Sequence, residues 1–329
     1  NKLKTHLKIF KRVDDSLYVL IPFYIPVFNS FFDKVNAALL KVQIRVISLL
    51  LGIRWKETLL WISGNFTLSP LLKFQFKKKV YQAADLISDF RTSNTSLLKN
   101  LRSKEIYLSR NVDFLFASSP NIKHKLEDLS GREVNLLTHG VDYVHFTKKK
   151  ELNPFIQVIK RKGLPIAGYF GTLSDANDKD VFLKLANNGF SVVIIGKVLG
   201  DYSSLEGKEN IYFAGPVEFR NLPSYADGFD VCLLNWIMAD WIKNSFPVKS
   251  LEYLALGKPV ISCRIPVIEE LFGSLVYFAD TPDEFLMQAT KSLAENNALL
   301  QEQRILEASK HTWDKKYKFI KSVIECEPV

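Results

Sequence analysis

Lys249 and Glu252 lie three residues apart in the stretch SFPVKSLEYLALGKPVIS, which covers positions 245–262. In a helix, residues at this spacing share one face, and near the start their side chains point toward the N-terminus. That end presents free N–H groups and about half a positive charge, which together attract an anion. A lysine that contacts phosphate and a carboxylate that accepts two ribose hydroxyls would bind a nucleotide. The alternative is an ordinary Glu–Lys pair on a solvated helix.

The neighbouring residues define the helix that would carry this pair. Ser245 is a candidate N-cap, and Pro247 suits a first turn, where a missing N–H costs nothing. Gly257 is typical of the position just after a helix, and the Lys-Pro that follows it prevents continuation. Residues 260–263, VISC, have the pattern of a buried strand. We therefore expect a short helix that leads into a strand.

The composition predicts a globular chain of two domains. It has 329 residues, of which 47% are hydrophobic and 24% charged. Cys232, Cys263 and Cys326 form no CxxC or Cys/His cluster, so we expect neither a metal site nor disulfides, and a reducing cytoplasm fits. No GxxxxGK[ST] or GxGxxG motif supports a P-loop protein or a dinucleotide oxidoreductase. The chain begins with Asn and no signal peptide is recognised, so we expect a fragment.

The net charge of +9 is unevenly distributed. Residues 1–150 hold 25 Lys and Arg against 12 Asp and Glu, whereas the remainder holds 19 against 23. A basic half is typical of proteins that bind nucleic acid or an anionic membrane surface. The apolar stretches 16–32 and 36–51 are interrupted by prolines or charges, so we expect no spanning helix. Residues 36–51 could be an amphipathic helix lying on a bilayer, or a helix packed on a sheet.

Short apolar strands alternate with helices, which predicts doubly wound parallel sheets in an α/β fold. A polar stretch at 143–154 is predicted to be the interdomain linker, and residues 283–327 are predicted to be helical. The strands are expected at 17–22, 58–63, 113–119, 134–138, 165–171, 191–196, 210–215, 230–235, 259–263 and 275–279.

Ligands of such sheets bind at the carboxyl ends of the strands. In the second half, Gly171-Thr172, Gly196-Lys197, Gly215-Pro216 and Asn235 follow predicted strands. Glycine at three of these ends would let a ligand approach the backbone closely. The predicted helix with Lys249 and Glu252 belongs to the same edge.

Several stretches resemble a known family. GYFGTLSDANDKD, VVIIGKV, NIYFAGPVEFRNLPSYADGFDVCLLN and FPVKSLEYLALGKPVIS are similar to the donor domain of retaining GT-B glycosyltransferases of family 4. Among these, the bacterial exopolysaccharide and teichuronic acid enzymes are the most similar branch. SSPNIKHKL and LLTHGVDYVHF resemble the end of that family's first domain. The resemblance covers residues 80–315 well.

The resemblance implies two Rossmann-like domains (GT-B) whose doubly wound parallel sheets face an interdomain cleft. Residues 1–150 would form the acceptor-side domain, N-terminally incomplete because its first strand and glycine loop are missing. Residues 151–312 would bind the nucleotide-sugar donor. Residues 313–329 would form a C-terminal helix that crosses back to the first domain.

The resemblance also implies roles in the donor site. Glu252 would hold the ribose hydroxyls, and Lys249 would face the diphosphate. The donor-binding residues would be Gly171, Thr172, Gly196, Val217 beside the base, Ser245, Phe246, Lys249 and Glu252. The catalytic residues would be Lys249, Asn244 and Asp240. Asn244 stands where the family often has a glutamate, and an amide can hydrogen-bond a hydroxyl but cannot stabilise positive charge.

The acceptor side is less defined. Asp85 and Asp89 are expected on loops of the first domain that face the cleft, and His139 is a candidate base or a structural residue. The Asp178-Lys179-Asp180 triplet spells a metal-binding DxD, but charges at a helix start explain it better, so we expect no metal. We expect no resident cofactor, since the nucleotide-sugar is a substrate, with UDP-sugar favoured over GDP-sugar.

The expected function is transfer of a sugar from a nucleotide-sugar to a saccharide or lipid-linked acceptor in cell-surface polysaccharide biosynthesis. The expected partners are this donor, this acceptor and an anionic membrane surface, without nucleic acid. The expected location is the cytoplasm, peripherally attached to the inner face of the plasma membrane. Three alternatives stay open: a GT-B sugar-nucleotide epimerase, a non-catalytic basic module that binds nucleic acid or membrane, and a truncated chain that keeps the fold without activity.

Overall fold

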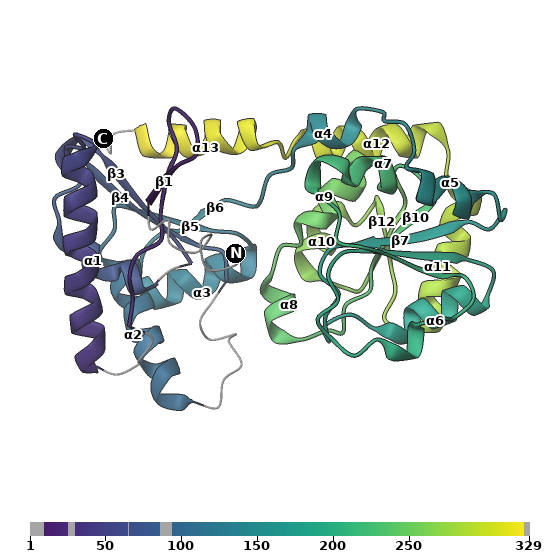
Figure 1. The fold of residues 1–329 in the computed structure, drawn as a ribbon, viewed down its shortest axis with the longest axis horizontal. Helices are drawn as coiled ribbons and strands as arrows, with labels where there is room; N and C mark the ends of the chain where they lie inside the picture. The colour runs from purple at the N-terminus through teal and green to yellow at the C-terminus, as the bar shows by residue number, and fades with distance from the viewer. Residues whose placement is uncertain (1–9, 26–29, 65, 86–93, 326–329) are drawn as a thin grey trace, which may run out of the picture. The chain divides into compact units, whose positions relative to one another are not determined.

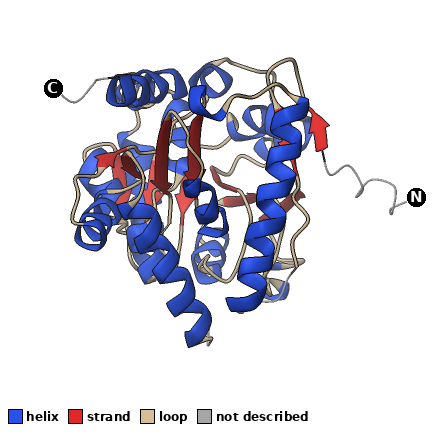
Figure 2. Cartoon of the chain, turned by 90° about the vertical axis from the view of Figure 1, so that its left-hand side faces the viewer, coloured by secondary structure: helices blue, strands red, loops and turns tan. Residues whose placement is uncertain are grey.

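The computed structural model describes residues 10–25, 30–64, 66–85 and 94–325. The chain divides into two compact units, each of which contains a sheet with helices packed against it (Figure 1). The first unit comprises Asn1–Ala117 and Lys123–Asn135, and the second comprises Ser118–Ile122 and Leu136–Val329. Strands and helices alternate along most of the chain. Figure 2 shows the helices in blue and the strands in red.

The sheet of the second unit confirms every strand predicted for that half of the chain. Its order is β12-β11-β10-β7-β8-β9, and its neighbouring strands run parallel. Runs such as SVVII and IAGYF are buried throughout, as expected for strands that are covered on both faces. The strands are β7 (Ile166–Phe170), β8 (Ser191–Ile195), β9 (Ile211–Gly215), β10 (Val231–Leu234), β11 (Val260–Ser262) and β12 (Val276–Phe278).

Helices cover both faces of this sheet, so the predicted doubly wound arrangement is confirmed. Side chains alternate along β8: Val193 and Ile195 pack with α9, α10 and α12, whereas Val192 and Ile194 pack with α6 and α11. The helices are α4 (Tyr143–Thr147), α5 (Pro154–Lys160), α6 (Lys179–Asn187), α7 (Leu222–Ala226), α8 (Asp240–Asn244), α9 (Val248–Ala255), α10 (Pro266–Phe272), α11 (Pro282–Glu295), α12 (Ala298–Ser309) and α13 (Trp313–Glu325), with 3₁₀ turns η4 (Ser203–Leu205) and η5 (Phe219–Asn221).

The predicted linker differs from the structure, and the predicted course of the last helix is not tested. The predicted linker begins with helix α4, because Asp142 caps it by accepting a hydrogen bond from the His145 N–H at 3.1 Å. Phe146 on this helix is buried in the core of the second unit. The expected crossing of α13 to the first domain stays a prediction.

The first unit has a sheet of order β3-β4-β5-β6, in which β4 pairs in parallel with β3 and β5. The predicted strand at 17–22 lies outside this sheet, because β2 (Tyr18–Leu20) pairs antiparallel with β1 (Phe10–Arg12). The other elements are β3 (Leu59–Ser63), β4 (Lys78–Ala83), β5 (Phe114–Ala117), β6 (Asn135–Leu136), α1 (Ser30–Leu50), α2 (Thr95–Arg110), α3 (Pro120–Ser130), η1 (Trp55–Glu57) and η2 (Phe66–Lys73).

The helix predicted at 36–51 is α1, which starts six residues earlier and packs on η2. Several of its apolar side chains face solvent, with Val42 60%, Val46 50% and Leu49 82% exposed. No helix in the described part of the chain combines the length and the apolar character that crossing a membrane requires.

Candidate donor site in the second unit

The strand order of the second unit defines where a ligand is expected to bind. From β7 the chain proceeds through β8 to β9, and it then returns to the opposite side of β7 with β10. The loops after β7 and β10 therefore diverge at the carboxyl edge of the sheet. Open α/β sheets bind ligands at such a switch point. Gly171 directly follows β7 and Trp236 lies just beyond β10, so both belong to this edge.

Helix α9 carries Lys249 and Glu252, as predicted, but it starts later than expected. Pro247 occupies the N-cap position with extended φ and ψ of −74° and 109°, and no side chain caps the helix. Ser245 instead ends α8, where its hydroxyl donates to the Ile242 carbonyl at 3.0 Å. The predicted N-cap is therefore wrong, because the residue before a proline avoids helical geometry. In the first turn, the Ser250 N–H donates to the Pro247 carbonyl at 3.0 Å, so the N–H groups of Val248 and Lys249 are the ones left for a ligand or water.

The end of α9 confirms the prediction for Gly257. This glycine has a φ of 71°, which residues with a side chain rarely adopt. Its N–H donates to the Leu254 carbonyl at 2.9 Å, and the Lys258 N–H donates to the Tyr253 carbonyl at 3.2 Å. These two bonds form a Schellman motif, which ends the helix and directs the chain into β11.

Lys249 reaches from α9 over the loop that follows β7. Its Nζ lies 5.4 Å from the ring centre of Trp236 and 5.6 Å from that of Tyr169. A Cβ atom at Gly171 would lie 2.2 Å from Lys249 Cε, so a side chain there would displace the lysine. Burial lowers the pKa of Lys249, and the charge of Glu252 opposes this shift. The sheet edge thus holds a partly desolvated cation between two aromatic rings.

Gly171 and Gly196 let two neighbouring strand ends pack backbone against backbone. Their φ angles are 129° and 142°, which favour glycine. A Cβ atom at Gly196 would lie 2.0 Å from the Gly171 carbonyl oxygen. The Gly171 N–H donates to the Ile195 carbonyl at 2.8 Å, so this loop continues the sheet. Both predicted glycines therefore shape the surface on which Lys249 lies.

The substitution Gly196→Ala is expected to destabilise the protein by about 2–4 kcal/mol, because it adds a backbone clash to an unfavourable φ. Chemical denaturation measures the free energy of unfolding. Gly189→Ala is the matched control, since Gly189 also has a positive φ of 85° but open space around its Cβ position. Equal losses in the two variants would show that the contact with Gly171 is unimportant.

Glu252 lies one turn after Lys249, and burial raises its pKa to about 7 from an ordinary value of 4.5. The Lys249 charge lowers this pKa but does not offset the burial. Near neutral pH the carboxyl is thus divided between its two protonation states. A ligand with hydroxyl donors would stabilise the carboxylate, because hydrogen bonds to the charged form favour it.

The pH dependence of stability follows from this raised pKa. The folded protein binds the Glu252 proton more tightly than the unfolded chain, so stability from this group is present below about pH 4.5 and lost as pH rises to about 7. Glu252→Gln is therefore expected to stabilise the unliganded protein by about 1–3 kcal/mol at pH 8 and by little at pH 5. Urea unfolding at both pH values measures this, with exposed Glu302→Gln as control. A pH-independent difference would contradict the assigned cause.

Three of the predicted donor-binding residues differ in how exposed their side chains are, namely Thr172, Val217 and Phe246. Thr172 is exposed, and its carbonyl accepts a hydrogen bond from the Tyr169 hydroxyl at 2.9 Å. Val217 is half-buried beyond β9 and packs against the core of the unit. Phe246 is buried, and its ring centre lies 5.9 Å from that of His139. The Phe246 side chain is thus part of the core, whereas Thr172 lies at the surface.

Asp240 and Asn244 lie at the two ends of the short helix α8, which precedes α9. Asp240 is exposed, and its carboxylate lies 3.3 Å from Lys243 Nζ. Asn244 is 6% exposed, and its carbonyl accepts a hydrogen bond from the Ser119 hydroxyl. The structure thus places both residues just before the α9 start, and their catalytic roles stay predictions.

The three predicted acceptor residues do not form one cluster within either unit. Asp85 is exposed just beyond the end of β4 in the first unit. Asp89 lies outside the described residues. His139 is half-buried in the second unit, against Phe246. Their contact with an acceptor stays a prediction.

The DxD-like triplet forms a helix start. Asp178 caps α6, and its carboxylate accepts a hydrogen bond from the Asp180 N–H at 2.9 Å. This confirms the interpretation of these charges as a cap. Within the ranges that the structure describes, no group of three or more His, Cys, Asp or Glu residues could hold a metal ion.

Sequence reasoning does not single out Trp236 or Tyr169, whose rings flank Lys249. A usable signal is the position of Trp236 directly after Asn235, at a predicted strand end. Asn235 connects the two loops of the site: its side-chain amide donates to the Asp178 carbonyl at 2.7 Å, and its own carbonyl accepts from the Asp178 N–H at 2.8 Å.

Part of the chain is similar in sequence to glycosyltransferases. The family described as "Glycosyl transferases group 1" matches residues 165–296, which hold β7 to β12 and α9. TuaH of Bacillus subtilis (strain 168), named as a teichuronic acid biosynthesis glycosyltransferase, is 25% identical over 246 residues. This alignment covers 69% of the chain and 62% of TuaH, so the chain spans less than two thirds of its relative's length.

Solved structures agree on the fold. Sucrose-phosphate synthase from Thermosynechococcus elongatus matches with a TM-score of 0.73 and 12% identity, over 96% of this chain and 84% of that one. Alr3699/HepE from Anabaena, solved in complex with UDP, matches with a TM-score of 0.66 and 15% identity, over 88% and 82%. These likenesses, with a parallel sheet in each unit, confirm the predicted α/β fold of GT-B type.

Proposed function

We propose that this protein is a glycosyltransferase that moves a sugar from a nucleotide-sugar to a saccharide or lipid-linked acceptor in cell-surface polysaccharide biosynthesis. The observation that carries the proposal is Lys249, a partly desolvated cation packed over Gly171 at the switch point of the sheet. The family match covers this same region, and the relative TuaH is named for teichuronic acid biosynthesis.

In the proposed mechanism, Lys249 and the uncapped start of α9 contact the diphosphate of the donor. Negative charge grows on the diphosphate as the glycosidic bond breaks, and a cation already in place stabilises that charge. Glu252 accepts the ribose hydroxyls and so fixes the nucleotide. Asp240, Asn244 and Ser245 surround the sugar. We propose retention of configuration without a metal ion, in line with the resemblance to retaining family 4 enzymes.

UDP-sugar is the donor that we favour, because Alr3699/HepE, with the same fold, was solved with UDP. The test is calorimetric titration with UDP and GDP, followed by a donor screen that measures nucleotide release with saccharide and lipid-linked acceptors. Binding of UDP with sugar transfer supports the proposal. Formation of an epimeric nucleotide-sugar from donor alone would identify an epimerase, and absence of binding by both nucleotides would refute the proposed donor site.

We also propose that the basic first half attaches the protein to the anionic cytoplasmic face of a membrane, where a lipid-linked acceptor would lie. Each Lys or Arg near such a surface contributes about 1 kcal/mol. Sedimentation with vesicles is expected to show binding that requires anionic lipid and weakens as salt rises above about 0.1 M. Equal binding to neutral vesicles would contradict the electrostatic basis.

A further inference from the structure

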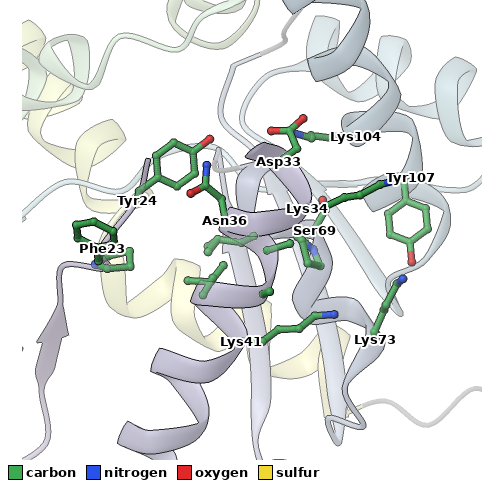
Figure 3. A pocket seen from close by; sticks show the side chains of 16 residues that line it. Phe23, Tyr24, Asp33, Lys34, Asn36, Lys41, Ser69, Lys73, Lys104 and Tyr107 are labelled. Atoms are coloured by element: carbon green, nitrogen blue, oxygen red, sulfur yellow. The ribbon is translucent and has the colours of Figure 1, made fainter. Parts of the chain in front are cut away.

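Two cavities lie along helix α1 in the first unit. The first, of about 600 Å³, is lined by residues 22–24, α1, η2 and α2 (Figure 3). The second, of about 640 Å³, is lined by the last part of α1, η1 and η2. Lys73 lines both cavities. We call the two together the α1 groove.

Cations outnumber acids in the α1 groove. Its two acids are already paired, Asp33 with Lys104 at 3.1 Å and Glu57 with Arg54 at 3.0 Å. The other cations have no acidic partner among the described residues: Lys34, Lys41, Arg45, Lys56 and Lys73. Three of these charges lie on α1 and the other two lie on η1 and η2, and together they favour an anionic ligand.

The walls of the groove are largely apolar. Phe23, which lines the first cavity, is 63% exposed, and Leu49, which lines the second, is 82% exposed. Trp55 and Phe74 stack edge to face in the second cavity, with ring centres 4.1 Å apart. Figure 3 labels Phe23 and Lys73 among the side chains that line the first cavity. A ligand that suits this groove therefore has an apolar part as well as negative charge.

One wall of the groove is held in place by two amide side chains of α1. The Asn36 amide donates to the Ile25 carbonyl at 2.9 Å and accepts from the Ile25 N–H at 2.9 Å. The Gln43 amide makes the same pair of bonds with Phe23, at 3.1 and 2.7 Å. These bonds fix the backbone that carries Phe23, so the wall exists before any ligand binds.

We propose that the α1 groove binds the phosphate head and the first part of the chain of one anionic membrane lipid. Lys34 and Lys73 contact the phosphate, and the apolar wall near Phe23 and Ala38 contacts the chain. This inference rests on the proposed function, in which the acceptor-side unit works at a membrane. It differs from diffuse electrostatic attachment in requiring a cavity with a defined stoichiometry.

The test uses dodecyl phosphate below its micelle concentration as a soluble probe, with binding followed by calorimetry. We expect one saturable site. Inorganic phosphate has the negative charge but no alkyl chain, and dodecyl maltoside has the chain but no charge. Both should bind far more weakly than dodecyl phosphate. Inorganic phosphate binding as tightly as dodecyl phosphate would identify a free phosphate site and overturn the proposal.

Two variants separate the cavity from overall charge. Lys34→Ala/Lys73→Ala is expected to weaken dodecyl phosphate binding roughly thirtyfold, from two lost cations. Its matched control is Lys99→Ala/Arg102→Ala, which removes two exposed cations of the same unit that do not line the groove. Ala38→Phe places a bulky ring in the lining of the first cavity without changing charge and is expected to weaken binding at least tenfold.

Equal losses in the groove variant and its control would refute a defined site, and so would unchanged binding by Ala38→Phe. Circular dichroism and thermal unfolding verify that each variant is folded. The probe assay needs no donor. A wild-type protein that failed to bind UDP would therefore refute the proposed function, and the lipid-binding result could still be interpreted.

Discussion

Lys249→Ala is expected to lower the rate of sugar transfer about 10²–10³-fold, the usual cost of removing one preorganised group that stabilises developing charge. The lysine is held over Gly171 and between Trp236 and Tyr169, so no other cation can take its place without moving these groups. The loss should fall on kcat, because the diphosphate gains charge as the bond to the sugar breaks.

Steady-state kinetics with the donor found in the screen measures this loss. Lys291→Ala is the control, because Lys291 is an exposed residue of α11 whose only described ion pair is a surface pair with Glu295. It should retain activity within about twofold, as surface ion pairs contribute little. A folded Lys249→Ala variant with near wild-type kcat would show that Lys249 does not contact the diphosphate.

Glu252→Ala is expected to weaken UDP binding roughly tenfold to a hundredfold. Hydrogen bonds to a charged group contribute about 1.5–3 kcal/mol, and the ribose would lose its acceptor. Because the pKa of this carboxyl is raised to about 7, wild-type affinity should also rise between pH 6 and pH 8, and the variant should lack this rise.

Calorimetric titration with UDP and GDP at both pH values measures both effects. Glu302→Ala, on the exposed face of α12, serves as the control and should bind like the wild type. Unchanged affinity of Glu252→Ala for both nucleotides would show that the ribose is held elsewhere. The same pH response in wild type and variant would assign the titration to a different group.

The sheet of the second unit could be predicted from sequence because its strands are continuous apolar runs. VVII in β8 and VCLL in β10 are buried on both faces, so no polar residue interrupts the pattern. Gly257 was equally readable, since a positive φ strongly favours glycine. Lys249 and Glu252 could be predicted to lie side by side, because two residues that are three positions apart in a helix share one face.

Strand β4 could not be predicted, because the lysines at its start suggest solvent. Val80 and Tyr81 are nevertheless completely buried. The Lys79 ammonium donates a hydrogen bond to the Leu72 carbonyl at 2.9 Å, so a lysine can stand in this strand while its aliphatic chain lies along it. Tyr81 donates to the buried Glu105 carboxylate at 3.2 Å, a contact between residues that sequence alone does not connect.

The wrong N-cap and the missed aromatic residues have different causes. Ser245 has the right chemistry for an N-cap, but it is the C-cap of the preceding five-residue helix α8, which is too short to show a periodic pattern. Trp236 and Tyr169 meet Lys249 only because β10 returns to the side of β7. Strand order is a property of the whole sheet, so local pattern does not reveal it.

Because the carboxyl of Glu252 is buried, selection for stability and selection for activity should favour different residues at this position. At neutral pH this residue costs folding free energy, and a bound nucleotide would return that cost by stabilising the carboxylate. A library sorted only for heat resistance without nucleotide should therefore enrich uncharged residues at position 252, and the enriched clones should lose donor affinity. Sorting the same library with nucleotide present should retain glutamate. The residue that gives the highest stability at position 252 would therefore depend on whether nucleotide is bound.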